Sequence, residues 1–232
     1  MLTLENLHLS YGGAPLLRAD WQMPARSKIA VIGPSGAGKS TLLHAIAGFL
    51  APDAGRILWQ GADITHVDPA RRPVSMIFQD NNLFPHLTAF QNVALGLRPD
   101  LRLSPADEQQ VREALARVGL AQFEQRKPRA LSGGQQSRVA LARVLVQARQ
   151  MILLDEPFSA LGPALRDEML SLVGDVADAL GASVLMVSHD IRDAQRFADQ
   201  IIWLDGGIAA PPQPTAQILA NPPEGLRAYL GR

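Results

Sequence analysis

The chain has 232 residues, 47% of them hydrophobic, which is enough for one large folded domain or two small ones. Lysine plus arginine and aspartate plus glutamate each total 22, so the formal net charge is zero, which argues against nucleic-acid binding and against a polybasic lipid-binding segment. No cysteine is present, which excludes disulfides and thiolate metal sites. The amino terminus lacks the pattern of a signal peptide and no apolar run approaches ~18 residues, so we expect a soluble cytoplasmic protein.

The first third of the sequence is typical of strands. Short apolar alternations in residues 1–30 predict antiparallel strands, and the run KIAVIG at 28–33 predicts a buried strand. A glycine-rich turn then leads into a segment typical of a helix, STLLHAIAGFL at 40–50. Further strands are expected at 56–61 and 74–78.

The turn between that buried strand and the helix has the pattern of a phosphate-binding loop. Residues 33–41 read GPSGAGKST, which fits G-x-x-x-x-G-K-[ST]. Glycines allow backbone N–H groups to turn toward phosphate oxygens, and a helix start adds about half a positive charge. Lys39 would reach the β- and γ-phosphates, and the Ser40 hydroxyl would bind Mg²⁺. The alternative, an ordinary glycine turn that caps a helix, is disfavoured because the flanking strand and helix are the context that the motif requires.

The middle of the chain, from about residue 80 to 148, favours helices. Ser104 is expected to cap a helix that begins at Pro105, with Asp107 at the spacing of a capping box. The motif LSGGQ at 131–135 precedes another predicted helix, 136–148. Unpaired N–H groups and the helix dipole at Ser132, Gly133 and Gly134 would form a second anion site, which suggests that another copy of the chain closes over the nucleotide. The alternative is a simple capped helix after a glycine turn.

The last third alternates strands and helices. Strands are expected at 151–155, 183–188 and 201–205, and helices at 163–180 and 190–198. This order implies a mostly parallel sheet that is covered on both faces, so the fold class is α/β. The proline-rich stretch 211–214 is interpreted as a linker to a short terminal helical segment.

Polar residues follow two of these apolar strands. Asp155 and Glu156 end the first, where Asp155 would hold Mg²⁺ through water and Glu156 would polarise an attacking water molecule. His189 follows the second and is a further candidate near the γ-phosphate, because ligand groups gather at the carboxyl ends of parallel strands. The alternatives are a pair of acids that cap the following turn and an exposed structural histidine.

Taken together and in this order, these motifs resemble the nucleotide-binding subunits of ATP-binding cassette (ABC) transporters, over essentially the whole chain. The resemblance implies a P-loop NTPase core made of residues 1–79 and 149–210, with a mostly parallel sheet and an N-terminal antiparallel β region. It also implies an inserted α-helical subdomain at 80–148, which carries the signature, and a C-terminal helical tail at 211–232.

The resemblance implies roles for individual residues. Three would be catalytic: Glu156, His189 and Gln79, the last in the motif MIFQD. Ser40, Gln79 and Asp155 would bind the metal. The expected nucleotide-binding residues are Tyr11, which would stack on adenine, the loop residues Gly33, Pro34, Ser35, Gly36, Ala37, Gly38, Lys39, Ser40 and Thr41, and the signature residues Ser132, Gly133, Gly134 and Gln135.

The resemblance also implies ligands and partners. ATP and Mg²⁺ would bind between two copies of the chain paired head to tail. Two transmembrane permease subunits, or one fused permease, would receive the energy, and a periplasmic substrate-binding protein would act indirectly, which places the chain at the cytoplasmic face of the bacterial inner membrane. Nucleic acid is not expected, because neither the long coiled-coil insertion of repair ATPases nor the doubled cassette of translation factors is present. An exporter cassette is a less favoured alternative.

Within the family, residues 71–97 look similar to the ATPase subunits of bacterial thiamine importers, and iron and sulfate importers remain alternatives. Two positions depart from the family pattern. The D-loop, Ser159–Gly162, usually ends in aspartate, and Gln136–Ser137–Arg138 keeps only the last basic residue that often follows the signature. Gly162 raises a second hypothesis, that the chain is an ATP-gated dimerisation module with impaired hydrolysis.

Overall fold

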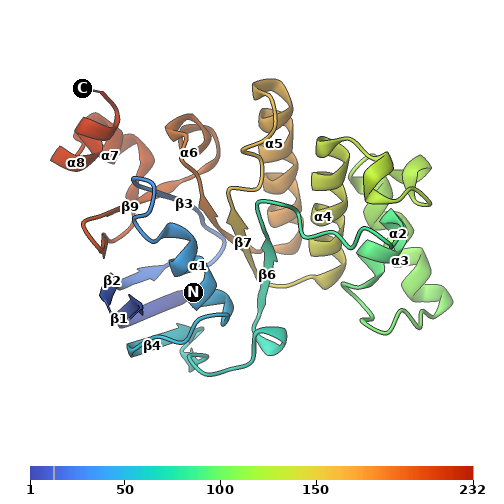
Figure 1. Ribbon diagram of the computed structural model, residues 1–232, viewed down its shortest axis with the longest axis horizontal. Coiled ribbons are helices and arrows are strands. Elements are labelled where there is room, and N and C mark those ends of the chain that lie inside the picture. Colours follow the sequence, from blue (N-terminus) through green and yellow to red (C-terminus); the bar gives the residue numbers. More distant parts are fainter. Residues whose placement is uncertain (13, 232) are drawn as a thin grey trace. The chain divides into compact units, whose positions relative to one another are not determined.

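The computed structural model describes residues 1–12 and 14–231, and its contacts divide the chain into two compact units (Figure 1). The first unit consists of Met1–Val74 and Ala182–Arg232, and the second of Ser75–Gly181. No helix within the described ranges is long and apolar enough to cross a membrane.

The amino-terminal part of the first unit is antiparallel, as predicted. Strand β1 (Leu2–Tyr11) pairs antiparallel with β2 (Ala14–Met23) and with β4 (Ala54–Trp59), which continues to β5 (Ala62–Asp63). The leucines at 2, 4, 7 and 9 are all buried although their spacing breaks the period of two. A register shift between Leu4 and Leu7 inserts an extra residue, so both leucine pairs face the core.

The rest of the first unit contains the parallel strands. Strand β3 (Lys28–Ile32) lies between β8 (Ser183–Val187) and β9 (Gln200–Asp205) and is parallel to both. The strand order within this unit is β5-β4-β1-β2-β10-β9-β3-β8, with β10 at Ile208–Ala209. The helices of this unit are α1 (Lys39–Ala47), the 3-10 helix η1 (Pro69–Arg71), α6 (Ile191–Phe197), α7 (Thr215–Ala220) and α8 (Glu224–Tyr229).

The interpretation of residues 211–214 as a linker is wrong for its second half. Gln213 and Pro214 form strand β11, which pairs antiparallel with the start of β9. Two residues without an apolar run give no periodic signal, and a proline is tolerated in so short an edge pairing. The tail is therefore attached to the sheet before α7 begins.

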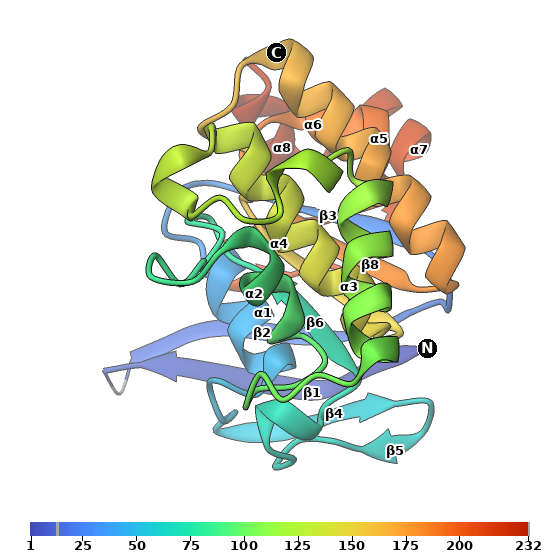
Figure 2. The same ribbon diagram turned by 90° about the vertical axis from the view of Figure 1, so that its right-hand side faces the viewer.

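The second unit combines two strands with four α-helices. Strands β6 (Val74–Ile77) and β7 (Met151–Asp155) are neighbours in the sheet. Helices α2 (Ala89–Ala94) and α3 (Pro105–Arg117) pack on α4 (Gly133–Gln147), which packs on α5 (Pro163–Leu180) (Figure 2). The 3-10 helices η2 (Ala121–Phe123) and η3 (Pro128–Ala130) connect α3 to α4.

The α/β fold class is confirmed, with parallel strands, an antiparallel amino-terminal region and a helical segment. The capping box at Ser104 is also confirmed, because its N–H donates to the Asp107 carboxylate at 2.9 Å and its hydroxyl accepts from the Asp107 N–H. The Ser104 N–H and the Ser104 hydroxyl both donate to the Asp107 carboxylate at 2.9 Å, and these two hydrogen bonds hold the pKa of Asp107 below its ordinary value. The subdomain boundaries at 80–148, 149–210 and 211–232 stay predictions. In the structure, residues 149–181 belong to the same compact unit as the helices α2 to α4.

Candidate functional site

The glycine-rich loop begins where β3 ends, in a space that only glycine fits. Ile32 pairs in register with Trp203 of β9, so Gly33 comes next to Leu204. A Cβ atom on Gly33 would lie 2.0 Å from the Leu204 carbonyl oxygen. Gly36 and Gly38 have φ angles of 78° and 99°, in the left-handed region that glycine adopts without strain.

The loop leads into α1, which begins at Lys39. The Lys39 side chain is 6% exposed, and its ammonium donates to the carbonyl oxygens of Gly33 and Pro34, at 2.8 Å each. The loop thus folds around this ammonium, while Ser35, Gly36 and Ser40 are exposed to solvent. A curled glycine backbone, a helix amino terminus and a positioned ammonium fit a polyphosphate anion.

The other end of α1 is fixed by a residue that sequence analysis missed. The Arg72 guanidinium is 1% exposed and donates to four backbone carbonyls, those of Ala45, Ile46, Thr65 and Val67, at 2.7–2.9 Å. Gly48 ends the helix with φ 91°, and a Cβ atom there would lie 2.6 Å from Arg72 Nε. Burial lowers the pKa of Arg72, but a guanidinium stays charged at neutral pH. Arg72 therefore joins the phosphate-loop helix to the segment that precedes β6.

His189 emerges at the same edge of the sheet as the phosphate loop. Val31 of β3 pairs in register with Val187 of β8, and the Ser188 N–H donates to the Val31 carbonyl at 3.3 Å. Gly33 and His189 each lie two residues beyond this pair, just after the ends of two neighbouring parallel strands. His189 is exposed, and the Ser188 hydroxyl fixes its loop by donating to the Asp193 carboxylate at 2.7 Å. The parallel pairing of β3 with β8 thus places residues 33–41 and His189 at the same edge of the sheet, and their roles stay predictions.

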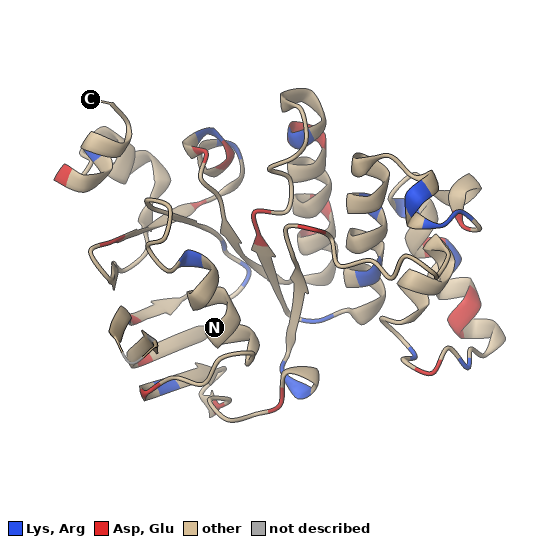
Figure 3. Ribbon diagram, in the orientation of Figure 1, with Lys and Arg blue, Asp and Glu red and all other residues tan. Residues whose placement is uncertain are grey.

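In the second unit, Asp155 is the last residue of β7 and Glu156 follows it, so this end of the strand carries negative charge (Figure 3). Every residue of β7 is buried, and Asp155 is 9% exposed at its tip. Glu156 has φ 45°, a left-handed conformation that costs a residue with a Cβ atom about 1–3 kcal/mol. The following turn compensates, because the N–H and hydroxyl of Ser159 both donate to the Glu156 carbonyl. The Glu156 side chain therefore extends from a strained backbone that two hydrogen bonds hold in place.

Gly162 occupies the position before α5 and acts as its N-cap. Its φ and ψ are −65° and 159°, an extended conformation open to any residue, and no side-chain hydrogen bond caps the helix. A Cβ atom on Gly162 would meet nothing within 4 Å. The preceding turn is closed independently, since Arg166 Nη2 donates to the Ser159 carbonyl at 3.2 Å. The glycine is thus not required by the local fold.

The signature motif forms a capping box, which corrects the expectation of an unpaired N–H group at Ser132. The Ser132 hydroxyl accepts from the Gln135 N–H at 3.3 Å, and the Gln135 side-chain oxygen accepts from the Ser132 N–H at 3.0 Å. The pattern S-x-x-Q in the sequence was the available signal. A Cβ atom on Gly134 would lie 2.6 Å from the Leu165 side chain, so this glycine lets α4 and α5 approach closely.

The two remaining predicted residues lie at strand ends. Gln79 follows β6 in an exposed turn, on the strand that neighbours β7. Tyr11 ends β1, but its side chain lies outside what the structure describes.

The loop beyond Gln79 is held by Asn92, a fully buried amide that sequence analysis missed. Asn92 accepts from the Phe84 N–H at 2.8 Å and donates to the Phe84, Leu87 and Thr88 carbonyls.

Comparison with known proteins identifies the family. The sequence profile described as ABC transporter matches residues 16–159, more than half of the chain. The chain belongs to the ABC transporter family. Among curated relatives in this family, the thiamine import ATP-binding protein ThiQ of Cereibacter sphaeroides is 58% identical over 231 residues, and that of a Ruegeria species is 57% identical, with 100% of both chains covered in each case.

Solved structures of ABC proteins have the same fold. The ATP-binding cassette MJ0796, a dimer in a post-hydrolysis state bound to ADP and Pi, has a TM-score of 0.81 at 31% identity, covering 93% of this chain and 99% of its own. The cbiO1 protein of Clostridium perfringens, part of the ABC transporter complex cbiONQ, has a TM-score of 0.85 at 27% identity, covering 99% and 94%. The ABC ATPase fold is therefore confirmed, and the chain is an ATPase of this family.

Proposed function

We propose that this chain hydrolyses ATP to drive thiamine import through separate membrane subunits. The observation that carries the proposal is the similarity, at more than half identity over the whole length, to curated thiamine import ATP-binding proteins. The similarity of residues 71–97 to the ATPase subunits of thiamine importers, which the sequence alone indicates, favours the same substrate. Thiamine itself would be selected by the membrane subunits and a periplasmic binding protein, so this chain would supply the energy rather than the specificity.

The nucleotide would be held first by the loop of the first unit. Backbone N–H groups of 33–41 and the Lys39 ammonium would bind the β- and γ-phosphates, and Tyr11 would stack on adenine. The predicted metal ligands Ser40, Gln79 and Asp155 offer a hydroxyl, an amide and a carboxylate. All three are oxygen donors, which is the type of ligand that Mg²⁺ prefers.

The metal would depend on the nucleotide. No cluster of three or more histidine, cysteine, aspartate or glutamate residues in 1–12 and 14–231 could hold a metal ion. Phosphate oxygens and water would therefore complete the Mg²⁺ shell, and bound Mg²⁺ supplies neutralisation of charge on the β- and γ-phosphates. Glu156 would polarise the attacking water and His189 would contact the γ-phosphate, a role supported by its exit beside the phosphate loop.

A second copy of the chain would complete the site. In a head-to-tail dimer, the signature residues Ser132, Gly133, Gly134 and Gln135 of one copy would contact the ATP held by the loop of the other. The dimeric state of the related cassette with ADP and Pi supports this arrangement. The dimer would bind two permease subunits, or one fused permease, at the cytoplasmic face of the bacterial inner membrane.

Uptake of labelled thiamine by a strain that lacks the chromosomal copy tests this function. The wild-type chain should restore uptake, whereas Lys39→Ala should not, because it removes the ammonium that organises the loop. Unchanged affinity of Lys39→Ala for ATP in calorimetry would contradict the nucleotide site. Restored uptake of iron or sulfate, without thiamine, would assign the alternative substrates.

Glu156→Gln tests hydrolysis and dimerisation separately from substrate. This variant should bind ATP normally and accumulate as an ATP-bound dimer, because the attacking water is no longer polarised. Only monomer in gel filtration at saturating Mg-ATP would count against the dimer.

The second candidate function rests on Gly162, whose missing carboxylate leaves α5 without a side-chain cap. A dimerisation module with impaired hydrolysis would bind ATP and dimerise but show little steady-state turnover with its membrane partners present.

A further inference from the structure

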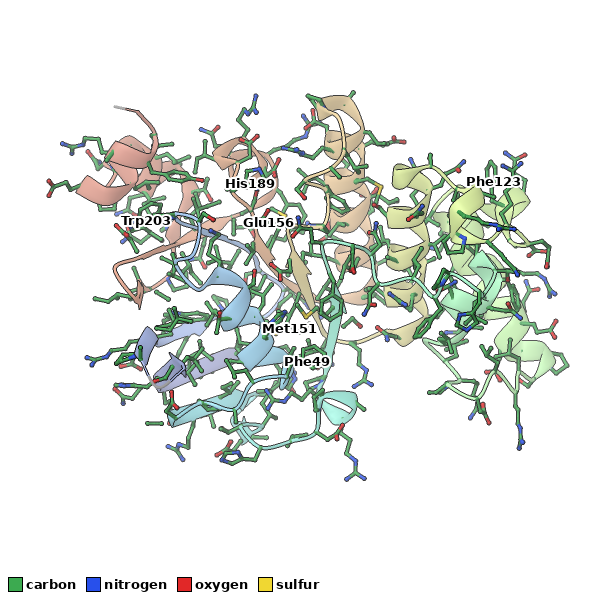
Figure 4. All side chains as sticks on the ribbon, viewed as in Figure 1. Phe49, Phe123, Met151, Glu156, His189 and Trp203 are labelled. Carbon is green, nitrogen blue, oxygen red and sulfur yellow. The ribbon has the colours of Figure 1, made fainter. Side chains whose placement is uncertain are left out.

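The carboxyl-terminal tail reaches the loop that carries His189. Tyr229, the last residue of α8, donates its phenolic hydroxyl to the backbone carbonyl of His189 at 2.5 Å, across 40 residues of sequence. Figure 4 labels His189 at the end of β8, in the same unit as the tail. A predicted terminal segment with no assigned chemistry therefore contacts a candidate catalytic residue.

Packing fixes α8 firmly enough for this contact to be specific. Leu226 is fully buried in a cluster that includes Ile32, the residue before the phosphate loop, and Ala194 of α6. A Cβ atom on Gly225 would lie 2.4 Å from the Asp205 carboxylate, so the start of α8 approaches β9 as closely as glycine permits.

The tyrosine is held at both of its ends. Its ring meets the Trp203 ring edge-on, with centroids 5.6 Å apart and planes at 61°, and Trp203 pairs in register with Ile32. Aromatic pairs in this geometry contribute about 0.5–1.5 kcal/mol beyond their buried area. The hydroxyl then extends from this anchored ring to the His189 carbonyl. Tyr229 thus connects the strand beside the phosphate loop to the loop of His189.

The backbone around His189 is consequently fixed on two sides. Before it, Ser188 is tied to β3 through its N–H and to Asp193 through its hydroxyl. After it, the carbonyl of His189 fixes the peptide plane that joins residues 189 and 190. The imidazole is exposed, and this fixed backbone sets the position from which it extends.

We propose that Tyr229 is a positioning residue that holds His189 toward the γ-phosphate, which makes the tail part of the catalytic unit. This inference rests on the role of His189 in the proposed function. In this assignment Tyr229 acts through its hydrogen bond to the His189 carbonyl and not through the phosphate loop. It should therefore affect turnover and leave ATP affinity unchanged.

Tyr229→Phe tests the proposal, because it removes the hydroxyl and keeps the ring against Trp203. In the full chain assembled with its membrane subunits, kcat should fall about five-fold, the change that one net hydrogen bond of about 1 kcal/mol gives, while KM for ATP stays constant. Thr215→Val is the matched control. The Thr215 hydroxyl donates to the Ala198 carbonyl at 2.7 Å, so this variant also loses one tail hydrogen bond, but away from His189. It should lower the melting temperature similarly and leave kcat unchanged.

A double-mutant cycle with His189→Ala decides between positioning and general stability. If Tyr229 acts through His189, adding Tyr229→Phe to His189→Ala should not lower kcat further. Wild-type kcat in Tyr229→Phe, an equal fall in Thr215→Val, or a further fall in the double mutant would overturn the inference. A reduced but measurable kcat in His189→Ala would leave the proposed function intact. Full activity of His189→Ala would instead remove the proposed role of His189, and the inference with it.

Discussion

Gly162→Asp should restore a capped and charged start to α5 without disturbing its surroundings. The extended φ and ψ of Gly162 suit aspartate, and the space around a Cβ atom is open to 4 Å. Aspartate is better than glycine at an N-cap by about a few tenths of a kcal/mol, and its charge at the helix dipole adds about 0.3–1 kcal/mol. For a chain of this size, about 1 kcal/mol raises the melting temperature by about 2–4 °C. The fold should therefore change little.

The functional effect should be larger than the effect on stability. The family pattern has aspartate at this position, and in the proposed head-to-tail dimer its carboxylate would lie at the interface between the two copies. Gly162→Asp should therefore raise the ATPase rate or its cooperativity in ATP. Gly162→Asn is the matched control, because asparagine caps the helix without the charge. Steady-state hydrolysis by the assembled transporter across a range of ATP concentrations measures both variants. Identical rates and Hill coefficients in wild type and Gly162→Asp would refute the reasoning, and the glycine would then be neutral.

Three further predictions concern stability and the nucleotide loop. Arg72→Met should lower the melting temperature by about 10 °C, because leaving its buried carbonyl partners without a donor costs about 3–5 kcal/mol, whereas the exposed Arg71→Met should change it little. Gly33→Ala should weaken ATP binding by about ten-fold or more in calorimetry, since its methyl group would collide with a backbone carbonyl of β9. Asp107 has a folded pKa below its ordinary 3.8, so its contribution to stability is present above that pH and is lost as the pH falls through the lowered value. The difference in urea midpoint between wild type and Asp107→Asn should therefore shrink below pH 3.8; a constant difference would contradict the linkage.

Local signals in the sequence were sufficient for most of the elements. Helix α5 has the predicted bounds, 163–180, because Pro163 suits the first helical position and Gly181 adopts the left-handed conformation that ends a helix. The phosphate loop followed from its motif, which combines a strand, a glycine turn and a helix. Each of these signals lies within a few residues of the structure that it specifies.

Contacts between distant residues could not be predicted in this way. Arg72 binds carbonyls 27 and 26 residues earlier, and Tyr229 binds one 40 residues earlier, so no local pattern marks their partners. The strands β10 and β11 each have two residues and depend on pairing with β9 rather than on periodicity. The cap at Ser132 was local and could have been read from the sequence.

The left-handed backbone at Glu156 has a consequence for the evolution and engineering of this chain. Glycine or asparagine at this position would relax the backbone and make the protein more stable, but would remove the carboxylate. Selection for stability alone therefore favours loss of the carboxylate that the proposed function requires, a local trade-off between stability and activity. Glutamine keeps the strain and changes only the charge, so Glu156→Gln isolates the chemistry, whereas a glycine variant would mix lost catalysis with gained stability.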